Sequence, residues 1–184
     1  RNALTREIQA KFLAEYAVNT LQLKRFAVLH PYEPFGLELK DIFIKEVESF
    51  GGEVVAVSGY ERTQNDFKKQ VLELGGVEDD ELEKIARELV LSEGVVPDFS
   101  SPSTFSRPLI DMGHWSGDDV EKLKVSLEFS YDAIFIPGVY DKVGLIIPQL
   151  AFYNVNTVSL LGTNGWNSPE LVKMGGRYLT NVFF

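Results

Sequence analysis

The chain has 184 residues, of which 45% are hydrophobic and 24% are charged, and its sequence contains no cysteine. A globular chain of this length buries roughly 70% of its unfolded surface, so it can fold without a disulfide or a structural metal. Its 18 Lys and Arg against 27 Asp and Glu give a net charge of −9, and no local basic patch offsets this, so we expect no nucleic-acid partner. The apolar runs are far shorter than the ~20 residues of a membrane helix, so we expect no transmembrane segment in this chain.

The compartment and the chain ends give less information. A sequence without cysteine suits the cytoplasm as well as an exported protein that avoids stray thiol chemistry. The chain begins at Arg1 without a methionine and stops at Phe184, and we interpret it as a piece of a longer polypeptide.

Helical and extended patterns alternate over the first 74 residues. Two prolines in residues 31–36 predict a loop after the first strand, because proline prevents regular pairing. We expect the first helix to bury a broad apolar stripe made of Ile8, Phe12, Leu13, Tyr16, Ala17 and Leu21. The predicted elements are a helix from 5 to 21, a strand Phe26–His30, a helix carrying Leu39 to Phe50, a strand Glu53–Tyr60 and a helix Asn65–Leu74.

Residues 75–130 interrupt this alternation. An acidic helix at about 79–91, a Ser/Pro-rich tract at 97–108 and a short helix ending at Phe129 indicate an insertion that is partly mobile. The alternation then resumes. The later predicted elements are a strand Asp132–Pro137, a helix Asp141–Tyr153, a strand Thr157–Leu161, a helix that begins at Ser168-Pro169 and a strand Tyr178–Phe184.

Five strands with helices between them predict an α/β fold. Alternating units of this length favour a parallel sheet with right-handed crossovers and helices on both faces, which is a three-layer doubly wound arrangement. We expect about five strands in the order 2-1-3-4-5, the flavodoxin-like topology. In such sheets a ligand binds beyond the carboxyl ends of the strands.

No motif in the sequence indicates a catalytic site. It lacks a P-loop, a glycine-rich dinucleotide fingerprint and a G-x-S-x-G nucleophile elbow. The two histidines, His30 and His114, lie far apart and neither has a partner at ligand spacing, so we predict no metal site. Pro137-Gly138 stands where a phospho-acceptor domain would need an acidic residue. We therefore expect neither an enzyme nor a cofactor.

Aromatic and amide side chains follow the predicted strands instead. Rings together with a few hydrogen-bonding groups are what a small-molecule cleft uses for recognition without catalysis. The predicted ligand-binding residues are Phe35, Tyr60, Tyr140, Asn164 and Trp166. The alternative is that rings such as Phe35 and Trp166 only plug the edge of the sheet. Tyr140 and Asn164 are the stronger candidates, because each directly follows a strand and has a glycine nearby.

Several short runs occur in an order that resembles one family. They are Phe26–Gly36, the Gly51–Val55 run, Asp66-Phe67, Gly138–Tyr140 and the run 162–165. Together they resemble the second lobe of type I periplasmic solute-binding proteins, and the Leu/Ile/Val-binding, receptor-family ligand-binding group in particular. The resemblance covers nearly the whole chain except residues 75–130.

The resemblance implies that residues 1–184 form a single α/β lobe cut from a two-lobed protein that closes around a solute. It implies that Tyr140 faces the ligand and that the ends Arg1 and Phe184 lie close together on the hinge side. It places Asn164 in a loop where amino-acid binders often carry a glutamate for the ligand's ammonium group. Asn164 is neutral, which weighs against a free amino acid as the ligand.

Three functions emerge as hypotheses. The first is the solute-binding component of an ABC-type importer, periplasmic or otherwise extracytoplasmic, whose partners are a small polar solute and an ABC permease. A lipid anchor in the full-length protein stays open. The alternative is an activator of penicillin-binding proteins with a cell-wall synthase as partner, because the insertion and the run 162–171 are also similar to lipoproteins of that kind. The third is a flavodoxin-like enzyme domain.

Overall fold

The computed structural model describes residues 5–77, 129–155 and 157–184. The chain divides into two compact units, one formed by residues 1–75 with 129–184 and the other by residues 76–128. All described residues except Gly76 and Val77 belong to the first unit. Several predictions fall outside the described residues. They concern the acidic helix, the Ser/Pro-rich tract, His114, the mobility of the insertion and the position of Arg1.

The first unit is built on a five-stranded parallel sheet in the order β2-β1-β3-β4-β5, so the predicted α/β topology is confirmed. Its strands are β1 (Arg25–Pro31), β2 (Glu53–Tyr60), β3 (Ala133–Phe135), β4 (Ser159–Leu161) and β5 (Val182–Phe183). In the register at the centre of the sheet, Val28 lies opposite Val57 on one side and Phe135 on the other. β2 and β5 form the two edges.

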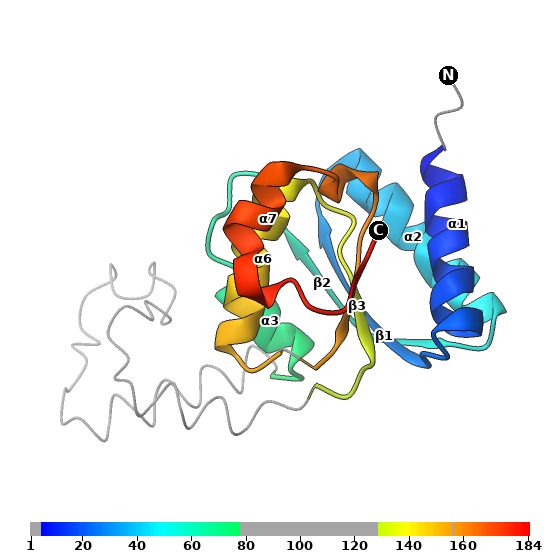
Figure 1. Ribbon diagram of the computed structural model, residues 1–184. Helices are drawn as coiled ribbons and strands as arrows, with labels where there is room; N and C mark the ends of the chain where they lie inside the picture. The colour runs from blue at the N-terminus through cyan, green and yellow to red at the C-terminus, as the bar shows by residue number, and fades with distance from the viewer. Residues whose placement is uncertain (1–4, 78–128, 156) are drawn as a thin grey trace, which may run out of the picture. The chain divides into compact units, whose positions relative to one another are not determined.

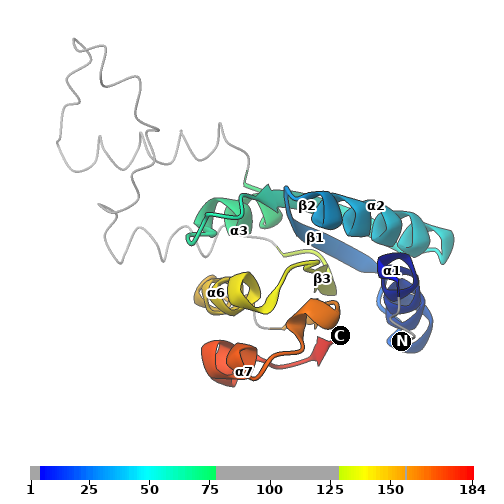
Figure 2. The same cartoon turned by 90° about the horizontal axis from the view of Figure 1, so that it is seen from above.

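Helices cover both faces of this sheet, as Figures 1 and 2 show. The helix α1 (Arg6–Glu15), its π-helical continuation η1 (Tyr16–Thr20) and α2 (Pro34–Ser49) lie on one face. On the other face lie α3 (Lys68–Leu74), α6 (Tyr140–Phe152) and α7 (Pro169–Gly175). The short 3-10 turns η3 (Asn164–Trp166) and η4 (Gly176–Tyr178) flank α7. The three predicted layers are present.

Local chemistry accounts for several helix ends. The side-chain oxygen of Thr5 accepts a hydrogen bond from the Ile8 N–H, and Ser168 caps α7 in the same way through the Glu170 N–H. Such caps satisfy N–H groups that have no partner within the helix. After α2 the chain turns at Gly51, whose φ of 84° is a left-handed conformation that glycine adopts without strain.

The core between the sheet and the α1/α2 layer is aromatic at its centre. The ring of Phe43 stacks on Phe135 with centroids 4.1 Å apart and meets the edge of Phe26 at 5.8 Å. All three side chains are fully buried, and Val28 and Leu161 belong to the same cluster. Truncating a buried phenylalanine of this kind costs about 3–5 kcal/mol of stability.

The face that α1 buries differs from the predicted stripe. Ile8 and Phe12 are 49% and 68% exposed, so the prediction is wrong for these two residues. The residues that α1 and η1 bury are Ala10, Leu13, Ala14, Ala17 and Val18. Alanines allow the closest approach of α1 to α2 and the sheet, and their side chains are too small to dominate a hydrophobicity pattern.

Several boundaries also differ from the sequence predictions. β1 continues through Pro31, and α2 begins at Pro34, so the predicted loop 31–36 shrinks to two residues. Proline is tolerated at both places because a strand end and a first helical turn need no N–H donor there. The last three strands are shorter than predicted, and β5 comprises only Val182–Phe183.

Candidate functional site

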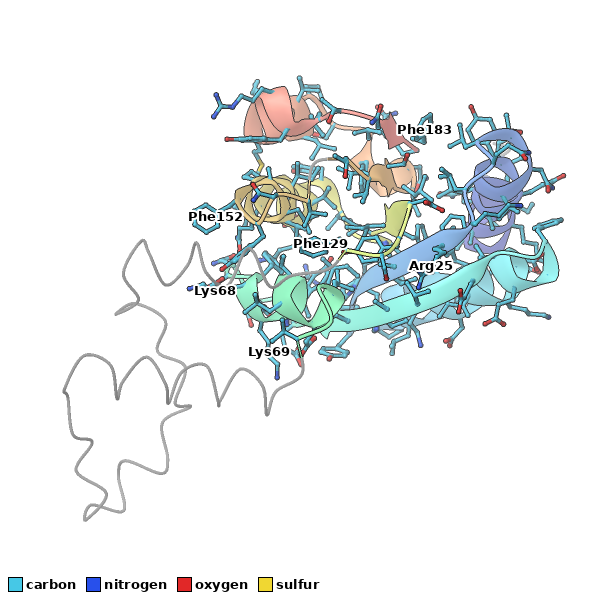
Figure 3. The ribbon with its side chains drawn as sticks, turned by 90° about the horizontal axis from the view of Figure 1, so that it is seen from below. Arg25, Lys68, Lys69, Phe129, Phe152 and Phe183 are labelled. Carbon is cyan, nitrogen blue, oxygen red and sulfur yellow. The ribbon has the colours of Figure 1, made fainter. Side chains whose placement is uncertain are left out.

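The carboxyl ends of the strands meet at one edge of the sheet, which we call the rim. The Tyr32 N–H, just after β1, donates to the carbonyl oxygen of Tyr60 at the end of β2, at 2.9 Å. The amino ends of α2 and α6 lie at this edge, because both helices run antiparallel to the strands. Figure 3 views the opposite edge, where Arg25 begins β1 and Phe152 at the end of α6 points away from the sheet.

Tyr140 and Asn164, the two strongest sequence candidates, are both exposed at the rim. Tyr140 is the first residue of α6 and is 38% exposed. The backbone N–H of Asn164 donates to Gln9 Oε1 of α1 at 3.3 Å. The two loops touch, because a Cβ added at Gly165 would lie 3.0 Å from the Gly138 carbonyl oxygen.

Phe35 lies at the start of α2 and is half-buried. One part of the side chain packs against the core of the α1/α2 layer. The guanidinium carbon of Arg6 stands 5.8 Å from the ring centroid, which is a cation–π distance. The ring therefore has a structural role and also an exposed part that it can offer to a ligand.

Trp166 is fully buried. Its indole lies directly over Gly162, where any Cβ would overlap the ring, and its centroid is 6.0 Å from that of Phe184. Packing accounts for this side chain, as the alternative interpretation of the sequence allowed. Its role in ligand binding stays a prediction.

Tyr60 is also buried, with 1% of its surface exposed. Its ring meets the edge of Phe67 at 5.2 Å, and its hydroxyl stands beside Gly138. Burial raises the pKa of Tyr60 well above its ordinary value, and the carboxylates of Glu33 and Asp141 raise it further. The hydroxyl therefore keeps its proton at every physiological pH.

A polar network holds the loop between β2 and α3 against α6. Lys142 Nζ donates to the Gln64 carbonyl oxygen at 2.8 Å and to Asn65 Oδ1 at 2.9 Å. Gln149 receives the Phe67 N–H on its Oε1 at 2.7 Å and donates through Nε2 to the Asn65 carbonyl oxygen at 3.0 Å. Sequence reasoning missed these residues. The one available signal was an amide, Gln149, within the apolar second half of α6.

Charged and titratable side chains also lie near the rim. Arg62 contacts Glu33 at 3.2 Å, but the arginine is largely exposed, so the pair contributes little stability. His30 is buried at the end of β1, with Nδ1 3.1 Å from the Pro31 carbonyl oxygen, and burial lowers its pKa. In the described part of the chain, no three His, Cys, Asp or Glu residues form a group that could hold a metal ion.

The rim can recognise a ligand through rings, amides and backbone N–H groups. α2 begins at Pro34, which has no N–H, and α6 begins at Tyr140; neither helix has a side-chain cap, so the N–H groups of Phe35, Tyr140 and Asp141 are not occupied by a cap. None of the helices within the described ranges is long and apolar enough to cross a membrane.

No family model matches the sequence, and no curated protein matches it either. Solved structures do match the fold. A leucine-binding protein from Thermotoga maritima superposes with a TM-score of 0.59 at 20% identity, over 95% of this chain and 35% of its own. A branched-chain amino acid substrate-binding protein from Streptococcus pneumoniae, in complex with isoleucine, gives 0.60 at 16% identity, over 97% and 36%. A solute-binding protein of an ABC transporter from R. palustris, in complex with benzoate, gives 0.60 at 11% identity, over 95% and 33%.

The chain has the fold of the type I periplasmic binding proteins. The predicted resemblance is therefore confirmed at the level of the fold. The chain spans about a third of the length of these structures. At identities of 20% or less, the likeness carries no ligand or partner from those proteins to this one.

Proposed function

We propose that the chain is part of the solute-binding component of an ABC-type importer and forms one side of its ligand cleft. Solved structures with this fold are described as ABC-transporter or branched-chain amino acid binding proteins, and those with a named ligand hold isoleucine or a benzoate. The proposed partners are a small polar solute and an ABC permease, and the proposed location is periplasmic or otherwise extracytoplasmic.

One observation supports this proposal most strongly. Phe35, Tyr140 and Asn164 come from the ends of three different strands, and all three have exposed surface at the same rim. Ligands of doubly wound sheets bind at this edge. Ring faces there supply contact area, and amides supply hydrogen bonds that orient the ligand.

The chemistry of the rim constrains the ligand. Asn164 can donate and accept hydrogen bonds but carries no charge, so it gives a ligand's ammonium group only a weak partner. Tyr140 offers a ring face, which binds apolar groups and cations alike. We therefore propose an amino-acid-like or other small polar solute that does not depend on a carboxylate counter-ion at residue 164.

A ligand screen on the intact protein tests the proposal. A bound solute raises the melting temperature by mass action, so thermal shift followed by calorimetry identifies it. Tyr140→Ala with Asn164→Ala should abolish the binding. Phe152→Ala is the matched control, because Phe152 is an exposed ring at the opposite edge. Unchanged affinity in the double variant would contradict the proposal.

The alternative role as an activator of penicillin-binding proteins depends on the insertion. That segment lies outside the described residues, so no contact or charge among the described residues favours the role. The same variants separate the two functions. If cell-wall activity survived Tyr140→Ala with Asn164→Ala but was lost on deletion of residues 97–114, the alternative would replace the importer.

A further inference from the structure

Tyr60 differs from the other buried tyrosines of the described chain. Its hydroxyl makes no hydrogen bond with any residue that the structure describes. The hydroxyls of Tyr131 and Tyr153 also lack a partner, but they are fully enclosed. The Tyr60 hydroxyl is not among these enclosed atoms, although only 1% of the residue's surface is exposed. The ring is therefore buried, and the small surface that the residue exposes includes its hydroxyl oxygen.

The backbone around this hydroxyl leaves it room. A Cβ added at Gly138 would lie 2.7 Å from the hydroxyl oxygen, so only a glycine fits beside it. Gly138 leads directly into α6, which begins after Val139 without a side-chain cap. The hydroxyl thus stands beside the turn that leads from β3 into α6. A phenylalanine at position 60 would fill the same apolar site without bringing a polar group to this place.

The charges around the hydroxyl define what it can bind. Glu33 and Asp141 are the two charged groups that act on it, and both are acidic. Glu33 is paired with Arg62, whereas Asp141 lies in the first turn of α6. In this field the phenol stays protonated, so it can donate a hydrogen bond. The same two carboxylates oppose a second negative charge close by.

We propose that the Tyr60 hydroxyl donates a hydrogen bond to an uncharged oxygen of the bound solute, such as a hydroxyl, an ether or an amide carbonyl. The inference rests on the proposed solute-binding function and names the class of chemical group on the solute that the site recognises. It makes Gly138, beside the hydroxyl, the position that must stay small. A carboxylate oxygen is the competing acceptor.

The experiment uses the intact protein and three pairs of probes that differ in charge at one group: benzamide with benzoate, leucinamide with leucine, and glucuronamide with glucuronate. Thermal shift finds the binders, and calorimetry measures their affinity for wild type, Tyr60→Phe and Tyr131→Phe. Tyr131→Phe removes an unpartnered hydroxyl that lies before β3, away from the rim. One hydrogen bond to a ligand corresponds to roughly a tenfold change in affinity.

We expect the amide of each pair, whose oxygen is uncharged, to bind more tightly than the carboxylate and to lose about tenfold in affinity in Tyr60→Phe but not in Tyr131→Phe. If a probe binds wild type and Tyr60→Phe equally, the inference is wrong while the solute-binding function stands. If only carboxylates bind, the class of acceptor is wrong. If no probe and no other small solute binds wild type, the proposed function fails and the inference fails with it.

Discussion

The indole Nε1 of Trp166 donates a hydrogen bond to the carbonyl oxygen of Ile136 at 3.1 Å. This bond joins the loop after β4 to the turn after β3, so the two loops that carry Asn164 and Tyr140 share one buried anchor. The ring of Trp166 is fully buried above Gly162. The positions of the exposed residues Asn164 and Tyr140 thus depend on the buried side chain of Trp166.

The first prediction concerns this anchor. Trp166→Ala should lower the free energy of unfolding by about 3–5 kcal/mol, the range for removing a buried large aromatic side chain. Gly162→Ala should cost about 1–3 kcal/mol, because its Cβ overlaps the indole. Urea unfolding measures both. Phe184→Ala is the control, since Phe184 is largely exposed, and a loss as large as that of Trp166→Ala would contradict the assignment.

The second prediction concerns Asp132, which precedes β3. Its Oδ2 accepts the backbone N–H groups of Lys24 at 2.7 Å and Arg25 at 2.9 Å. Asp132→Ala should destabilise the protein by about 1–3 kcal/mol, because hydrogen bonds to a charged group are stronger than neutral ones. Asp132→Asn keeps one acceptor oxygen and should lose less. Equal losses in the two variants, measured by thermal unfolding, would show that the side-chain oxygen is not what matters.

The third prediction concerns pH and His30. Burial lowers the pKa of His30 below its ordinary 6.5, and the nearby Lys40 lowers it further, while Asp41 and the Pro31 carbonyl act in the opposite direction. The unfolded chain then binds a proton more readily than the folded one. The contribution of His30 to the free energy of unfolding is therefore constant above about pH 6.5. It falls as the pH drops below that value, by at most about 1.4 kcal/mol per pH unit.

Urea unfolding at pH 7.5 and pH 5.5 measures this effect. His30→Gln should lose less stability between the two pH values than wild type, because glutamine does not titrate. Some loss remains, since the other histidine and the acidic residues titrate in both proteins. A wild-type loss equal to that of His30→Gln would exclude His30 as the cause.

The fourth prediction tests which face α1 buries. Phe43→Ala should cost about 3–5 kcal/mol, whereas Phe12→Ala should stay within about 0.5 kcal/mol of wild type. Both variants delete the same ring, one from the core and one from a surface where it is 68% exposed. Chemical unfolding gives the two values. A large loss for Phe12→Ala would restore the stripe predicted from the sequence.

The sequence predicted the sheet well because alternation of strands and helices leaves few topologies. Right-handed parallel crossovers restrict the possible orders of five strands. Runs that contain β-branched apolar residues such as Val54 and Ile134 indicate strands. Which face of α1 is buried was harder to predict. Three of the five residues that α1 and η1 bury are alanines, Ala10, Ala14 and Ala17, whose small side chains carry little hydrophobic signal.

The candidate site was predicted less completely than the fold. Strand ends located the rim, so Tyr140 and Asn164 were found at exposed positions. The same rule could not tell an exposed ring from a buried one, because Trp166 and Tyr60 also follow strands. The Lys142 network was out of reach, since its partners lie 77 and 78 residues away and only the folded chain brings them together.

The bond from the Arg25 N–H to Asp132 closes a loop of 107 residues. β1 and β3 are neighbours in the sheet, so the centre of the fold cannot form until this long segment has closed on itself. Closure entropy grows only with the logarithm of length, and each doubling costs about 0.6 kcal/mol. The length of the intervening segment therefore affects how quickly the sheet assembles more than how stable it becomes, and evolution can vary that length at low thermodynamic cost.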